Sequence, residues 1–242
     1  MNIWTRRDLT IISGFGGRCA VIACDSCGGV GEKSNDCLKL PAYYVGKLTA
    51  RVVLYELMCA GSEPAVLSDG LACEMSPTGE EIVRGIKGEL KNAGLEDITL
   101  TGSTEENFPV SVTAVGITAV GIAEEGRLRF HKAVSGDKLV LLGRPAVGGE
   151  VELDSAGFYP QVRFLLSQPG VREISPVGSK GVAYEAGVLA SLNRMAFTPC
   201  QTDVDLKKSA GPVSCVLVLC DGTAADHIIS RLKQAIIIGC VR

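Results

Sequence analysis

Aromatic side chains, histidine and an excess of charge of either sign are all scarce in this chain. Aromatic residues make up only 5% of the 242 residues, which leaves little for stacking nucleic acid bases. The 24 Lys and Arg nearly balance the 27 Asp and Glu, so the net charge of −3 provides no basic surface for nucleic acid or an anionic membrane. Cys24 and Cys27 are spaced like a zinc-binding pair, but there is no second pair and no nearby His. We therefore expect no nucleic acid, membrane or zinc partner.

Long apolar segments are also missing. The longest, Val112 to Ala123, is broken by Gly116 and Gly121 and is too short to span a membrane. No long apolar stretch follows the basic residues near the N-terminus, so we predict no signal peptide. The ten cysteines are spread too thinly for a small disulfide scaffold. We therefore expect a soluble, cytoplasmic protein with reduced cysteines.

Short strands and amphipathic helices alternate along the chain. Expected strands cover residues 10–13, 18–24, 64–73, 98–100, 110–123, 127–131, 138–142, 171–174, 213–220 and 236–240, and expected helices cover 45–60, 76–93, 158–166, 183–194 and 223–234. Ser76 and Thr223 suit the N-cap positions of their helices. The Gly- and Pro-rich segment 143–149 predicts a boundary between domains 1–143 and 144–242. The pattern indicates a mixed α/β (α+β) protein.

Two of four polar segments could serve a nucleotide site. Gly14, Gly16 and Gly17 precede a strand, where glycines let backbone N–H groups approach phosphate, although this signal is weak by itself and a plain turn is the more common explanation. Glu56 is an acid inside an otherwise apolar helix, and it points either to solvent or into a site.

The other two segments carry the remaining candidates. Asp25 ends a strand, and glycines including Gly31 lead from it to Lys33. An acid for Mg²⁺ and a lysine for phosphate are what phosphoryl transfer requires, although the glycine spacing is not that of a P-loop. The polar turn 101–106 is either a hairpin loop or a source of further ligands. Its candidate residues are Gly102, Thr104 and Glu106.

In this order, the four segments resemble motifs of the aminoimidazole ribonucleotide (AIR) synthetase superfamily. Gly14 to Gly17 followed by Asp25 to Lys33 is similar to a glycine-rich segment followed by D-G-V-G-T-K, with two residues inserted after the Asp and Glu32 in place of Thr. Tyr55 to Pro64 is similar to N-D-L-x-x-x-G-A-E-P. Thr101 to Thr104 stands where the family has G-G-[ED]-T, and the resemblance covers about residues 10–125.

The resemblance implies a two-domain AIR-synthetase-like fold and an ATP-dependent reaction. It implies a homodimer in which the first-domain sheets pair to form a β-barrel, with a smaller second α/β domain that binds the acceptor. Asp25 and Lys33 would be catalytic, and Mg²⁺ would be held by Asp25, Glu56 and Glu106. The implied ATP contacts are Gly14, Gly16, Gly17, Gly31, Lys33, Gly102 and Thr104.

The chain departs from the family pattern in its acids. Ser103 replaces one family acid, and the segment 175–181 stands in place of D-x-T-x-G-G-L, so a second acid is lost. Fewer carboxylates suggest a reduced metal site. A compact member with altered ligands is similar to α-ribazole kinases, which phosphorylate the 5′-hydroxyl of a nucleoside in cobamide (vitamin B12) salvage.

Two alternatives remain open. One is a thiamine-monophosphate kinase or another ATP-dependent enzyme of the superfamily, and the other is a non-catalytic nucleotide-binding relative. No general base is evident, because His131 and His227 lie far from the motifs in sequence and are expected to be structural.

Overall fold

The computed structural model describes residues 1–242, which form two compact units. Unit 1 contains residues 1–58, 62–126 and 153–157, and unit 2 contains 59–61, 127–152 and 158–242. The elements before residue 127 are β1 (Asn2–Arg6), β2 (Leu9–Phe15), β3 (Arg18–Gly28), β4 (Val30–Gly31), β5 (Leu38–Lys39), α1 (Ala42–Cys59), β6 (Glu63–Leu71), the turn η1 (Met75–Gly79), α2 (Glu80–Asn92), β7 (Thr99–Thr104), β8 (Ala114–Glu124) and the turn η2 (Glu125–Arg127).

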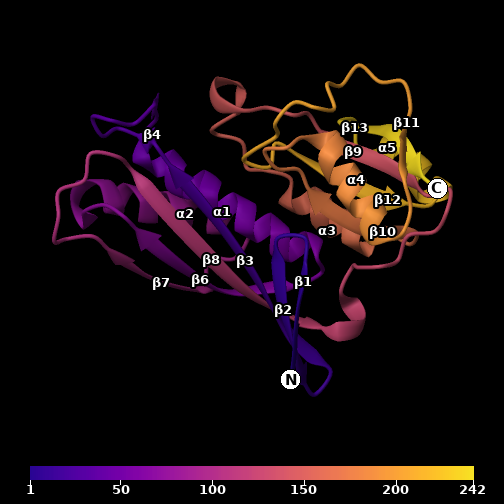
Figure 1. The fold of residues 1–242 in the computed structure, drawn as a ribbon, viewed down its shortest axis with the longest axis horizontal. Coiled ribbons are helices and arrows are strands. Elements are labelled where there is room, and N and C mark those ends of the chain that lie inside the picture. Colours follow the sequence, from indigo (N-terminus) through magenta and orange to yellow (C-terminus); the bar gives the residue numbers. More distant parts are fainter. The chain divides into compact units, whose positions relative to one another are not determined.

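Unit 1 is built on a six-stranded sheet with the strand order β1-β2-β3-β8-β6-β7. All neighbouring strands are antiparallel except β6 and β7, which are parallel. Buried and part-buried residues alternate along β2, β3 and β8, so one face of the sheet is covered and the other is partly open. Helices α1 and α2 lie against the sheet in this unit (Figure 1).

The two helices of unit 1 approach each other closely at glycines. A Cβ atom at Gly46 would lie 2.0 Å from the carbonyl oxygen of Ile82, and one at Gly85 would lie 1.8 Å from that of Tyr43. A buried ion pair ties the same helices together, with Arg51 Nε 2.6 Å from Glu89 Oε1. The contact therefore fixes α2 on α1.

Unit 2 contains a second, antiparallel sheet with the order β10-β12-β9-β13-β11. Its elements are β9 (Lys138–Gly143), the turn η3 (Gly148–Glu150), α3 (Tyr159–Ser167), β10 (Val171–Pro176), α4 (Val182–Leu192), β11 (Phe197–Pro199), β12 (Cys215–Cys220), α5 (Gly222–Arg231) and β13 (Ala235–Val241). Strand β12 is buried along its whole length, and its core includes residues of β9 and α4.

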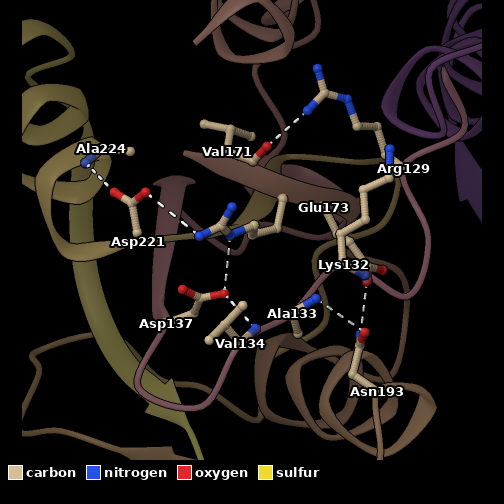
Figure 2. Close-up of polar contacts among 11 residues, drawn as sticks. Arg129, Lys132, Ala133, Val134, Asp137, Val171, Glu173, Asn193, Asp221 and Ala224 are labelled. Atoms are coloured by element: carbon tan, nitrogen blue, oxygen red, sulfur yellow. Dashed lines mark hydrogen bonds and ion pairs between the residues drawn. The ribbon is translucent and has the colours of Figure 1, made fainter. Parts of the chain in front are cut away.

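Polar contacts fasten residues 129–137 to the rest of unit 2 (Figure 2). Glu173 of β10 accepts hydrogen bonds from Lys132 N (3.1 Å) and from Asn193 Nδ2 (2.8 Å). Asp137 accepts one from Val134 N, and its carboxylate lies 3.4 Å from Arg172 Nε. These contacts place residues 127–143 in unit 2, whereas the expected boundary at Gly143 assigned them to the first domain.

Most of the expected elements are present, but three local expectations are wrong. Ser76 is extended and caps nothing, and α2 begins at Glu80 after η1. The N-cap of α5 is Asp221, whose carboxylate accepts from Ala224 N at 2.9 Å, and not Thr223. Residues 127–131 form no strand. No helix in the chain is both long and apolar enough to cross a membrane.

Candidate functional site

Two acids of unit 1 lie in one row across the first sheet. Asp25 of β3 pairs with Ile117 of β8, which in turn pairs with Asp69 of β6, and Asp69 pairs with Gly102 of β7. Because paired residues of neighbouring strands point to the same face, both acids share the face on which Ile117 is fully buried. They therefore lie on the covered side of the sheet.

Asp69 is a buried carboxylate without a partner. The residue is only 7% exposed and no cation or hydrogen-bond donor offsets its charge, although its oxygens are not among the fully buried polar atoms that lack a partner. Burial raises the pKa of Asp69, because nothing nearby stabilises its charge. A Cβ atom at Gly102 would lie 2.2 Å from Asp69 Oδ1, so this glycine leaves room for the carboxylate. The pairing explains why β7 has a glycine opposite the acid.

Asp25 is half-buried and also has no cation partner. Burial raises its pKa, a hydrogen bond from the Ser26 backbone opposes that rise, and the negative charge of Asp8 adds to it. Burial raises the pKa of the Cys27 thiol, and the negative charges of Asp25 and Asp36 raise it further. Asp25 and Cys27 are two residues apart on β3 and therefore point to the same face of the sheet.

Asp36 anchors that loop. Its carboxylate accepts hydrogen bonds from Thr113 N (2.8 Å), Thr113 Oγ1 (2.7 Å) and Lys33 N (2.8 Å). Burial alone would raise the pKa of Asp36, but these hydrogen bonds outweigh it and lower the pKa below its ordinary value. At Gly31 (φ +155°) a Cβ atom would lie 2.3 Å from Thr113 Oγ1, so only glycine fits there. The loop is therefore held rigidly beside the strand ends.

We call Lys33, Glu74, Thr78, Thr104 and Glu106 the loop cluster. Lys33 Nζ lies 2.6 Å from Glu74 Oε2, and Thr78 Oγ1 donates to Glu74 Oε1 at 2.5 Å. Burial opposes ionisation of Glu74, but the hydrogen bonds from Lys33 and Thr78 lower its pKa to about 2. Glu106 Oε1 accepts from Thr104 Oγ1 (3.0 Å) and from a backbone N–H of η1 (2.8 Å). Each acid of the loop cluster is already hydrogen-bonded.

Glu56 of α1 pairs with Arg7, which lies in the turn between β1 and β2. Glu56 Oε2 lies 2.5 Å from Arg7 Nη2, and the two side chains are 12% and 9% exposed. Arg7 has φ +53°, and Asp8, the next residue, is the one whose charge affects Asp25. The turn therefore borders both Glu56 and Asp25.

The structure brings together only some of the residues expected in the site. Gly14, Gly16 and Gly17 lie at the β2–β3 turn next to Arg18, seven residues along β3 from Asp25, or about 23 Å at about 3.3 Å per residue. ATP phosphates cannot contact this turn and the Asp25 end of β3 within one chain.

The three expected metal ligands are likewise not one group. Gly102 lies three strands from Asp25, about 14 Å at about 4.8 Å per strand, and Glu106 lies further along the chain from Gly102. No group of three or more His, Cys, Asp and Glu side chains in the chain is arranged to hold a metal ion. Asp25, Glu56 and Glu106 therefore occupy separate positions in unit 1.

Sequence reasoning missed Asp69, Glu74 and Arg7. An acid inside the apolar strand 64–73 was a usable signal for Asp69, in the same way that Glu56 was noticed inside its helix. Glu74 and Arg7 gave no such signal, because their partners lie 41 and 49 residues away along the chain.

Comparison with known proteins places this geometry in a recognised fold. Residues 10–123, somewhat less than half of the chain, match the family model described as AIR synthase related protein, N-terminal domain. A comparison with curated proteins gave no match.

Several solved structures share the fold across almost the whole chain. PurL from T. maritima, in complex with FGAR, aligns with a TM-score of 0.73 and 12% identity, covering 96% of this chain but only 43% of PurL. Thiamine-monophosphate kinase from Stenotrophomonas maltophilia K279a aligns with a TM-score of 0.65 and 17% identity, covering 99% of this chain and 88% of the kinase. HypE from E. coli aligns with a TM-score of 0.66 and 16% identity, covering 91% of this chain and 79% of HypE. The chain thus has an AIR-synthase-like fold and spans less than half of PurL.

Proposed function

We propose that this protein is an ATP-dependent kinase that phosphorylates a hydroxyl group of a small nucleoside-like substrate. The observation that carries the proposal is the pair of carboxylates, Asp25 and Asp69, that lie without a cation on one face of the sheet. The match of residues 10–123 and the fold shared with a thiamine-monophosphate kinase support ATP as the phosphoryl donor.

The donor chemistry of these two acids fits Mg²⁺, which prefers carboxylate oxygens and retains several waters. Asp25 would hold the ion, and Asp69 would supply a second carboxylate on the same face, about 10 Å away between Cα atoms at about 4.8 Å per strand. Glu106 fits less well, because its Oε1 already accepts two hydrogen bonds. Bound Mg²⁺ would neutralise the charge that develops on the transferred phosphoryl group.

Lys33 would meet the phosphates. Its ammonium group now pairs with Glu74, but the two side chains are 15% and 33% exposed, so an incoming phosphate can compete for it. Asp36 fixes the backbone of Lys33 and therefore the starting point of its side chain. Catalysis would rest on positioning and electrostatics, since phosphoryl transfer requires little covalent chemistry from the protein.

The acceptor we propose is α-ribazole, phosphorylated at its 5′-hydroxyl. Ser175, which stands where the resemblance places an acid, is fully buried, and its hydroxyl donates to the Pro176 carbonyl at 3.2 Å. A neutral, buried serine at this position cannot hold a metal ion that would balance the charge of an anionic acceptor, and this favours an uncharged acceptor. The alternative acceptor is thiamine monophosphate, favoured by the alignment over 99% of this chain with a kinase of that substrate.

The test is incubation with Mg-ATP and either α-ribazole or thiamine monophosphate, followed by product mass measurement. We expect a product heavier by one phosphoryl group with α-ribazole only, and no product with Asp25→Asn, whose fold is checked by circular dichroism. If thiamine diphosphate forms instead, the proposed acceptor is wrong and the acceptor is thiamine monophosphate, but the proposal that the protein is a kinase stands. Mg-ATP binding without any product over a wide nucleoside panel would favour the non-catalytic alternative.

We also propose that the protein is a homodimer joined through the open face of the first sheet. Apolar side chains form two rows there, with Ile22, Val120 and Val66 in one row and Ile122 in the next. Each is only partly buried within the chain. Light scattering should give twice the monomer mass, and Ile22→Lys should give the monomer.

A further inference from the structure

Glu56 is where the expected metal site and the observed contacts disagree. The resemblance implies a Mg²⁺ ligand at this position, but the carboxylate is paired with the Arg7 guanidinium at 2.5 Å. Both side chains are about nine-tenths buried, so the pair is not merely a screened surface contact. A metal ion at Glu56 would have to displace a positive charge that is already in place. The residues present therefore do not fit a metal ion there.

The backbone supports a specific role for Arg7. The turn that joins β1 and β2 contains two residues, and Arg7 is the first, with φ +53°. Two-residue hairpins that need this left-handed conformation strongly favour glycine or asparagine. A residue with a large side chain stays in such a conformation only when surrounding contacts hold it there. The contact that holds Arg7 is its ion pair with Glu56.

The guanidinium also keeps a free donor. Arg7 Nε is buried and has no hydrogen-bond partner in the protein. A buried donor without an acceptor is costly, and an anionic oxygen of a bound ligand would satisfy it. Arginine remains charged and presents several donors in a fixed plane, so it can neutralise one carboxylate and bind a second anion at once. A metal ion at Glu56 would likewise neutralise the carboxylate and bind a second anion.

We propose that Arg7 is the built-in cation of this site: it replaces a metal ion at Glu56 and turns its remaining donor toward an anionic oxygen of the nucleotide. The nucleotide part of this inference rests on the proposed kinase function. The replacement at Glu56 concerns the protein alone and can be tested without nucleotide.

The experiment counts Mn²⁺ ions bound to the full chain by electron paramagnetic resonance, without nucleotide. Glu56→Gln should bind as many ions as the wild type, because Glu56 is not a ligand. Arg7→Met should bind one ion more, since the positive charge that Arg7 places beside Glu56 is removed, and the double variant should lose that extra ion. A lower count in Glu56→Gln, or no additional ion in Arg7→Met, would overturn the proposal.

A second variant covers the case in which Arg7→Met does not fold. Arg7→Lys keeps a positive charge and should bind the wild-type number of ions, and Glu56→Gln then decides the question by itself. Failure of the kinase assignment has a different signature, namely no phosphorylated product while the Mn²⁺ counts follow the expected pattern. The two proposals can therefore fail independently.

Discussion

Replacing Asp69 by Asn should stabilise the ligand-free protein at pH 7. The residue is 7% exposed and no partner offsets the charge of its carboxylate. Leaving a buried polar group unsatisfied costs about 1–3 kcal/mol, and the lower end applies here because the Asp69 oxygens are not among the fully buried atoms without a partner. Asn keeps the shape and removes the charge, so part of that cost should disappear. For a chain of this size about 1 kcal/mol corresponds to about 2–4 °C, and thermal unfolding should show a rise of that order or larger. Mg²⁺ should stabilise the wild type more than the variant, which keeps only Asp25.

Asp36 provides a matched control, because it is equally buried but fully hydrogen-bonded. Asp36→Asn replaces an acceptor with a donor that faces other donors, so it should destabilise the protein by about 1–3 kcal/mol. The pH dependence of the two acids differs in sign. The pKa of Asp36 is lowered in the folded state, so its stabilisation is present above its ordinary pKa of 3.8 and is lost as the pH falls further.

For Asp69 the folded-state pKa is raised, so the charged form opposes folding at neutral pH. The advantage of Asp69→Asn over the wild type should therefore shrink as the pH falls through the folded-state pKa. If Asp69→Asn destabilised the protein as Asp36→Asn does, the carboxylate would be a structural group and our reason for treating it as a ligand would be refuted.

Three further predictions follow from contacts in unit 1. Glu89→Leu should cost about 3–5 kcal/mol in urea unfolding, because it removes the carboxylate that neutralises the buried Arg51. Adding Arg51→Met should recover most of that loss, and additive losses would contradict this. Gly102→Ala should weaken Mg²⁺ binding at least about tenfold by calorimetry, whereas Gly70→Ala, which meets open space, should not. Glu74→Gln should lower stability by up to about 1 kcal/mol above pH 4.5, and the difference from wild type should vanish as the pH falls to about 2.

The parts of the fold that could be predicted from sequence are those with a strong local pattern. The helix over 45–60 and the strand over 110–123 have regular apolar spacing, and both are present as α1 and β8. Strand β1 was missed because four of its five residues are exposed, so it has no alternation to detect. The expected strand at 127–131 failed because hydrogen bonds to distant residues, such as the one from Arg129 Nη1 to the Val171 carbonyl, hold this segment instead.

The candidate site follows the same rule. Asp25 and Lys33 were found because a short glycine-rich segment joins them, and local spacing is visible in a single sequence. The distance between Gly14 and Asp25 could not be predicted from local spacing in the sequence, because it depends on the length of strand β3. Arg7 was invisible as a partner of Glu56, because strand pairing and helix packing bring them together over 49 residues.

The acids of unit 1 differ in what balances their charge. This difference bears on whether the absence of family acids at positions 103 and 175 implies a loss of function. Glu56 has an arginine and Glu106 has hydrogen-bond donors, whereas Asp25 and Asp69 have no cation within the protein. A count of acids in the motifs therefore overstates the number of metal ions that the site needs. The serine at position 103 removes an acid from a region where Glu106 is already satisfied by the protein itself. Its presence is compatible with activity, provided that Asp25 and Asp69 respond to Mg²⁺ as expected.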